Sequence, residues 1–130
     1  MKRGLRTRLV ARVLLMLLLP PLPAWAHDEN HDHDEWYQSL NQPDNPTMSC
    51  CGLADAYWED EYYVKDGKTY AVITDNRDDG PLRRPHVPSG TVIEVPNYKL
   101  KWDRSNPTGH TIIFLTRERY VYCFVQSTGI

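Results

Sequence analysis

The sequence predicts an all-β fold, a small five-stranded barrel or roll, with an SH3-like barrel as the first choice. Three observations lead to this fold class. Short runs of β-branched and aromatic residues are bounded by Gly and Pro, little of the chain reads as helix, and the C-terminal part holds two strand-like runs in succession. Because an isolated hairpin is only marginally stable, short strands of this kind favour a small barrel or a compact roll.

Five runs, each bounded by turn-forming residues, predict the strands: 61–65, 69–74, 91–95, 111–115 and 120–125. The dipeptide Asp66-Gly67 predicts a hairpin turn between the first two runs. Residues 36–40 predict a short helical turn, and the Pro- and Gly-rich residues 76–89 predict a long irregular connection.

The first 26 residues have the pattern of a secretory signal peptide. Five cations in residues 1–12 precede the apolar run 13–19, and Ala24-Trp25-Ala26 places small residues where a signal peptidase cleaves. The apolar run is far shorter than the roughly 20 residues of a spanning helix. We therefore expect residues 1–26 to be removed, and the chain to be exported to the periplasm or the extracellular medium with no membrane association afterwards. Residues 27–35 predict a disordered acidic, His-rich tail, and 36–130 a single domain.

The charge changes once the signal peptide is removed. The whole chain has 15 Lys and Arg against 17 Asp and Glu. Because residues 1–26 hold five of the cations and none of the acids, the remainder carries a net charge of −7 with His neutral. This charge disfavours nucleic acid, whose phosphates are bound by cations, and it disfavours anionic lipid.

Three cysteines, Cys50, Cys51 and Cys123, allow one disulfide and leave one thiol. Joining Cys123 to the doublet would close a loop of about 70 residues, worth about 4 kcal/mol in the chain-entropy model. Either member of the doublet is a partner for Cys123, and we favour Cys51 because Gly52 after it eases the backbone turn. A structural zinc site fits poorly, since it requires four ligands in recognised spacings.

Several short motifs together resemble a group of small exported bacterial proteins: His27, Trp36-Tyr37, Cys50-Cys51-Gly52, Asp55 and Cys123-Phe124-Val125. The similarity covers residues 34–60 and 120–130. Those proteins commonly have Asp-Cys where this chain has Asp55-Ala56. The resemblance implies export and a disulfide-stapled fold, and it implies no activity and no site residues.

The N-terminal tail is the first candidate site. Cleavage after Ala26 would leave His27 with a free α-amine, and His31 and His33 follow among carboxylates. Imidazole is a good ligand for copper and zinc, so these three histidines are candidate ligands for Cu or Zn. The alternative is a solvated acidic tail without a ligand.

Three further candidate sites each have a structural alternative. A cysteine nucleophile with His86 or His110 as base would need a thiolate, whereas in an oxidising compartment the cysteines are expected to be bridged. The aromatic residues Tyr57 and Trp58 lie among carboxylates, and His110 ends a loop before a strand, so these three are candidate ligand-binding residues. Alternatively, the aromatic residues belong to the core and residues 106–109 form an ordinary turn.

These observations favour a non-enzymatic exported module that binds a protein or a cell-envelope ligand. The alternative function is binding or buffering of Cu or Zn by the His-rich tail. No motif in the sequence is specific enough to predict a reaction.

Overall fold

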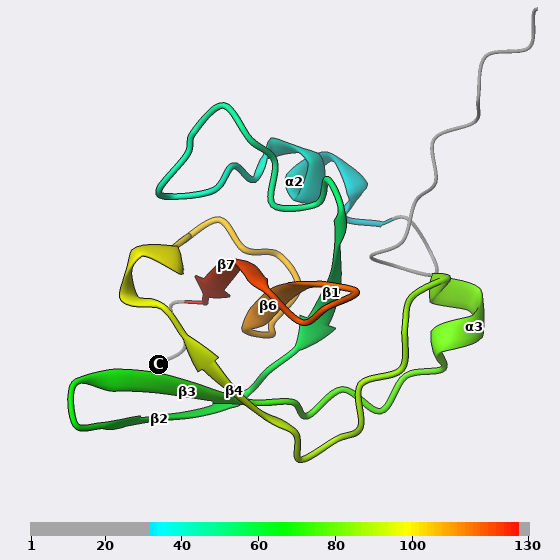
Figure 1. The fold of residues 1–130 in the computed structure, drawn as a ribbon. Helices are drawn as coiled ribbons and strands as arrows, with labels where there is room; N and C mark the ends of the chain where they lie inside the picture. Colours follow the sequence, from blue (N-terminus) through cyan, green and yellow to red (C-terminus); the bar gives the residue numbers. More distant parts are fainter. Residues whose placement is uncertain (1–31, 128–130) are drawn as a thin grey trace, which may run out of the picture.

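The computed structural model describes residues 32–127, which form a mainly β fold of two sheets (Figure 1). The signal peptide expected at 1–26 and most of the expected tail lie outside the described residues. Within the described part, seven strands form separate sheets of four and three strands rather than one closed barrel. The all-β class is therefore confirmed at the coarse level. These residues form no closed barrel and have seven strands instead of the expected five, and the SH3-like arrangement is not confirmed.

The four-stranded sheet has the order β1-β6-β7-β5. Its members are β1 (Ala54–Trp58), β5 (Leu100–Trp102), β6 (Ile112–Thr116) and β7 (Val121–Gln126). Neighbouring strands run antiparallel except β5 and β7, which are parallel. The predicted C-terminal hairpin forms the centre of this sheet, and every residue of β6 is buried.

The three-stranded sheet has the order β2-β3-β4 and is antiparallel throughout. Its strands are β2 (Glu61–Lys65), β3 (Lys68–Val72) and β4 (Val92–Val95). The turn between β2 and β3 has positive φ at both central residues, Asp66 at 52° and Gly67 at 72°. This is the backbone that an Asp-Gly hairpin turn adopts, so the predicted hairpin is confirmed.

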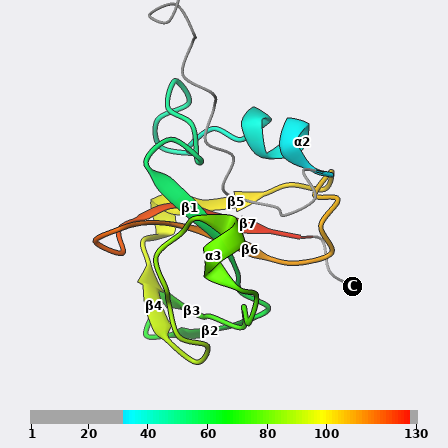
Figure 2. The ribbon, with the colours of Figure 1, turned by 90° about the vertical axis from the view of Figure 1, so that its right-hand side faces the viewer.

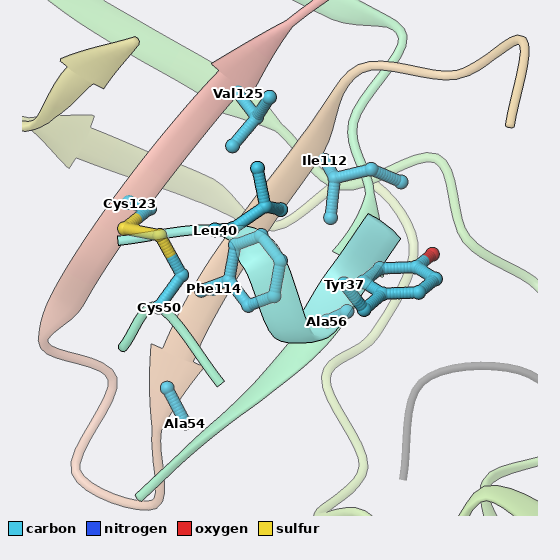
Figure 3. Close-up of a cluster of buried hydrophobic side chains, with 9 residues drawn as sticks. All are labelled: Tyr37, Leu40, Cys50, Ala54, Ala56, Ile112, Phe114, Cys123 and Val125. Atoms are coloured by element: carbon cyan, nitrogen blue, oxygen red, sulfur yellow. A yellow bond between two sulfur atoms is a disulfide. The ribbon is translucent and has the colours of Figure 1, made fainter. Parts of the chain in front are cut away.

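Hydrophobic side chains cover both faces of the four-stranded sheet. On one face, helix α2 (Asp34–Ser39) and the loop after it pack Tyr37 and Leu40 against Phe114 and the disulfide (Figure 3). On the other face, the three-stranded sheet and the loop after β3 contribute Ala71, Ile73 and other residues to a second cluster. Figure 2 shows the resulting layers, with α2 on one side of the four-stranded sheet and β2, β3 and β4 on the other.

The structure corrects several predicted boundaries. The helical turn expected at 36–40 begins two residues earlier, because Asp34 and Glu35 form the first turn of α2, where carboxylates interact favourably with the helix dipole. Two residues of the segment expected to be disordered, Asp34 and Glu35, are therefore helical. The connection 76–89 contains one helical turn, α3 (Asp79–Leu82). Further along the chain, a 3-10 turn, η2 (Asn97–Lys99), precedes β5.

Strands β1 and β5 were not predicted. Strand β1 is buried or half-buried along its whole length and so lacks a regular alternation of exposed polar and buried apolar residues. Strand β5 has three residues and pairs with β7 across a long stretch of sequence. Neither strand leaves a clear local pattern.

Candidate functional site

Trp58 and His110, two of the three residues predicted to bind a ligand, lie against each other. The imidazole of His110 stacks on the indole of Trp58, with ring centroids 3.8 Å apart and an interplanar angle of 11°. Arg77 also lies over the indole, with its guanidinium carbon 4.0 Å from the ring centroid. We call Trp58, Asp60, Arg77 and His110 the Trp58 cluster.

Asp60 fixes the imidazole of His110. Its Oδ2 lies 2.8 Å from His110 Nδ1, and its Oδ1 accepts a hydrogen bond from the backbone N–H of Thr111 at 3.2 Å. The backbone N–H of Asp60 donates to Thr74 Oγ1 at 3.0 Å. Asp60 therefore links the end of β1 to two loops, and the ring of His110 has a defined orientation at a partly exposed position.

The loop before β6 holds His110 from the other side. Asn106 Nδ2 donates to the carbonyl of His110 at 2.8 Å, and the N–H of Thr108 donates to Asn106 Oδ1 at 2.9 Å. Gly109 adopts a φ of 74°, as expected from its place in the predicted turn. The loop is therefore both an ordinary turn and a rigid support for the imidazole.

A buried ion-pair network lies behind the cluster. Arg77 donates from Nη2 and Nε to the two carboxylate oxygens of Asp75, at 2.6 and 3.0 Å. Arg84, itself buried, donates to Asp75 Oδ2 at 2.8 Å and to the carbonyl of Ala56 at 2.7 Å. Burial alone would raise the pKa of the Asp75 carboxyl, but the hydrogen bonds from Arg77 and Arg84 hold it well below its usual range. Asp75 is thus a permanent anion that positions Arg77.

The third predicted ligand residue, Tyr57, does not reach this surface. Its side chain is buried, its hydroxyl donates to the carbonyl of Pro85 at 2.6 Å, and Arg84 lies 4.4 Å from its ring centroid. Burial raises the pKa of Tyr57 to about 12. Adjacent residues of a strand point to opposite faces, so Trp58 packs at the border of the hydrophobic cluster on one face and Tyr57 is buried in the cluster on the other face. Tyr57 is therefore a core residue, which was the alternative to a ligand-binding role.

Sequence reasoning did not identify Glu59, which is buried. Neither carboxyl oxygen has a hydrogen-bond partner within residues 32–127. Burial, together with the charges of Asp60 and Glu61, raises the pKa of Glu59 to about 9, so the side chain is protonated at neutral pH. The run Glu59-Asp60-Glu61 was visible in the sequence, but no local pattern marked its first member as buried.

His86, considered as a base for a cysteine nucleophile, forms a second His–Asp pair away from Trp58. Its Nδ1 lies 2.6 Å from Asp79 Oδ2, and its side chain is largely exposed. Asp79 also accepts a hydrogen bond from Arg84 Nε at 2.6 Å. The pair resembles His110–Asp60 in its polar contact but lacks the stacked indole, so it is a natural control for that site.

The disulfide joins Cys50 to Cys123, with a Cα–Cα distance of 5.6 Å, and so corrects the preference for Cys51. The backbone N–H of Cys50 donates to the carbonyl of Leu40 at 2.9 Å, which fixes Cys50 beside α2 and within the core. Because adjacent side chains diverge, Cys51 turns away, and its thiol donates to the carbonyl of Tyr37 at 3.2 Å. Burial raises the pKa of Cys51 to about 12, which does not suit a nucleophilic thiolate.

The predicted metal ligands are not brought together in the described part of the chain. His27 and His31 lie outside it, and His33 lies just before α2 without a side-chain hydrogen bond to the helix. Among residues 32–127, no group of three His, Cys, Asp or Glu side chains is arranged to hold a metal ion. Copper or zinc binding by the tail stays a prediction, which titration with Cu²⁺ tests against a variant lacking the three histidines.

Comparison of the chain with protein-family models, with curated proteins and with solved structures gives no match. No helix within residues 32–127 is long and apolar enough to span a membrane.

Proposed function

We propose that the chain is an exported, non-enzymatic module that binds a protein partner through the Trp58 cluster. The observation that carries the proposal is the contact between His110 and Trp58, whose rings stack at 3.8 Å while Asp60 holds the imidazole. Aromatic, arginine and histidine side chains are thereby gathered from three segments of the chain. Trp and Arg are also the residue types that most often dominate the energy of protein interfaces.

Rigidity of the cluster supports a binding role. Binding costs conformational entropy for each side chain that becomes ordered, and a group already held in place avoids that cost. Asp75 holds Arg77 through two hydrogen bonds, and Asp60 holds His110. The cluster therefore offers a preorganised surface.

The chemistry of the cluster favours a protein over a glycan. Arg77 and His110 both lie against the indole of Trp58, so they occupy ring surface on which a sugar would stack. The carboxylate of Asp60 lies at this surface beside His110, and its side chain is 42% exposed. A partner with a cationic side chain is complementary to this acidic surrounding.

Export is part of the proposal. The pattern of residues 1–26 supports it, and so does the disulfide between Cys50 and Cys123, because disulfides persist in oxidising compartments. Fractionation of cells that express the full chain, followed by intact-mass analysis, tests it. We expect the protein outside the cytoplasm with His27 as its first residue.

The binding proposal is tested with two matched histidine variants. We expect His110→Ala to weaken binding of a captured envelope or extracellular protein about tenfold or more. His86→Ala removes the other His–Asp pair and should leave the affinity unchanged. Equal affinities of the two variants, or binding to isolated cell-wall glycan alone, would contradict the proposal.

A further inference from the structure

Strand β2 is an open sheet edge that exposes large side chains. All five of its residues are exposed, including Tyr62 at 47%, Tyr63 at 46% and Val64 at 65%. The strand pairs only with β3 within the described residues, and Figures 1 and 2 show no labelled element beyond it. Natural proteins usually protect such edges, because unpaired backbone groups invite another strand.

The hairpin turn determines which backbone groups of β2 are free. In a two-residue turn the residues on either side, Lys65 and Lys68, form a hydrogen-bonded pair, and the pairs along an antiparallel ladder then alternate. Glu61, Tyr63 and Lys65 therefore direct their N–H and C=O groups toward β3. Tyr62 and Val64 direct theirs outward, where they are available to a further strand.

We propose that the occupant of this edge is a second copy of the chain, paired through β2 in antiparallel fashion about Tyr63. This inference goes beyond the proposed function and involves a different surface from the Trp58 cluster. In this register the outward N–H and C=O groups of Tyr62 pair with those of Val64 in the other copy. By symmetry, the same groups of Val64 pair with Tyr62 of the other copy. The two three-stranded sheets thereby become one sheet of six strands.

Charge complementarity selects this register. Antiparallel pairing about Tyr63 places Glu61 opposite Lys65 of the second copy, twice in the symmetric pair. Both side chains are exposed, and neither makes an ion pair within residues 32–127. Each becomes part of an opposite-charge pair at a position without backbone hydrogen bonds, where side chains approach closely.

Aromatic packing adds to the same register. Tyr63 already stacks on Tyr70 of β3, with ring centroids 5.2 Å apart and an interplanar angle of 19°. Pairing two copies places their Tyr63 side chains opposite each other and so forms a row of four tyrosines across the sheet. On the other face, Tyr62 meets Val64 of the second copy, a pair of aromatic and β-branched residues that stabilises antiparallel sheets.

The test exchanges the charges at the two ends of β2 in the full chain, purified after expression. Sedimentation velocity from about 1 µM to about 1 mM should show a monomer–dimer equilibrium for the unmodified protein. Glu61→Lys and Lys65→Glu each create two repulsive pairs and should weaken the dimer about tenfold or more. The double variant, and an equal mixture of the two single variants, should recover it.

A covalent measurement covers the case in which a charge variant folds poorly. Tyr63→Cys places one cysteine of each copy beside the symmetry axis. The two Cα atoms of such a pair lie about 4.5 Å apart, so mild oxidation should cross-link the dimer. Tyr70→Cys, one strand further in, should not cross-link. A folded protein that stays monomeric throughout, a dimer insensitive to both single exchanges, or an edge occupied only by a strand of another protein overturns the proposal.

Discussion

Arg84 and Asp75 form an ion pair in which both side chains are buried, with Arg84 Nη1 2.8 Å from Asp75 Oδ2. Arg84 also donates to Asp79 and to the carbonyl of Ala56, so one guanidinium joins the loop after β3 to strand β1. The same Asp75 holds Arg77 beside Trp58. The long connection between β3 and β4 is therefore anchored by charge where it has little regular structure.

We expect Arg84→Met to lower the free energy of unfolding by about 3–5 kcal/mol, because Asp75 and Asp79 lose a buried partner. Arg83→Met is the matched control, since Arg83 is exposed and adjacent in sequence, and its effect should stay within about 0.5 kcal/mol. Denaturant unfolding measures both values. Similar stabilities of the two variants would show that the buried ion pair does not anchor the loop.

The pKa of Glu59 makes the stability of the fold depend on pH. Because its folded-state pKa of about 9 lies above the ordinary value of 4.5, the folded protein retains a proton that the unfolded chain releases. The free energy of unfolding should therefore fall as pH rises between these two values, by up to about 1.4 kcal/mol per pH unit from this group. Below pH 4.5 this contribution is constant.

Glu59→Gln tests this dependence, because glutamine has a similar shape and does not titrate. Its stability relative to the unmodified protein should increase as pH rises from about 5 to about 9. Glu118→Gln, at an exposed position, should track the unmodified protein across the same range. Parallel pH profiles for the unmodified protein and Glu59→Gln would show that Glu59 is already ionised in the folded state.

The two members of the cysteine doublet should respond differently to substitution by serine. Cys50→Ser breaks the bond to Cys123, which spans 73 residues, and should cost about 4 kcal/mol in the chain-entropy model. Cys51→Ser retains a donor toward the carbonyl of Tyr37 and should cost less than about 1 kcal/mol. Thermal unfolding of the two variants measures both losses of stability. Equal losses would mean that the disulfide to Cys123 exchanges between Cys50 and Cys51.

Thiol titration checks the same assignment chemically. The unmodified protein should show one thiol after denaturation without reductant, and that thiol should react slowly in the folded state because burial raises the pKa of Cys51 to about 12. Rapid reaction of the folded protein would place the free thiol at the surface.

Local signals in the sequence predicted much of the β architecture. Asp66-Gly67 predicted its hairpin because turn geometry depends on two residues, and the β-branched runs near the C-terminus became β6 and β7. Strand β1 was missed because its residues are buried or half-buried on both faces. The strand therefore lacks the regular alternation of polar and apolar residues that marks a strand with one exposed face. The expected five strands and the barrel alternative were not found, because strand number and pairing depend on contacts between distant segments.

The candidate site was predicted residue by residue and not as an assembly. Trp58 and His110 were each named, but their stacking depends on β1 pairing with β6, which no local pattern reveals. Tyr57 was grouped with Trp58 by sequence proximity, although the strand sends it to the opposite face. The choice between Cys50 and Cys51 likewise depended on a backbone hydrogen bond to Leu40, far outside the doublet.

The last prediction concerns Gly109, next to His110. Its φ of 74° lies in the left-handed region, so a Cβ is strained there even though no atom lies within 4 Å of it. Gly109→Ala should therefore cost about 1 kcal/mol and weaken partner binding by displacing His110. Gly52→Ala is the control, because Gly52 has no positive φ and its added Cβ would meet only Ser49 O at 3.9 Å. Unfolding measurements that show equal effects at both positions would mean that the loop backbone relaxes, and that it does not hold the imidazole in place.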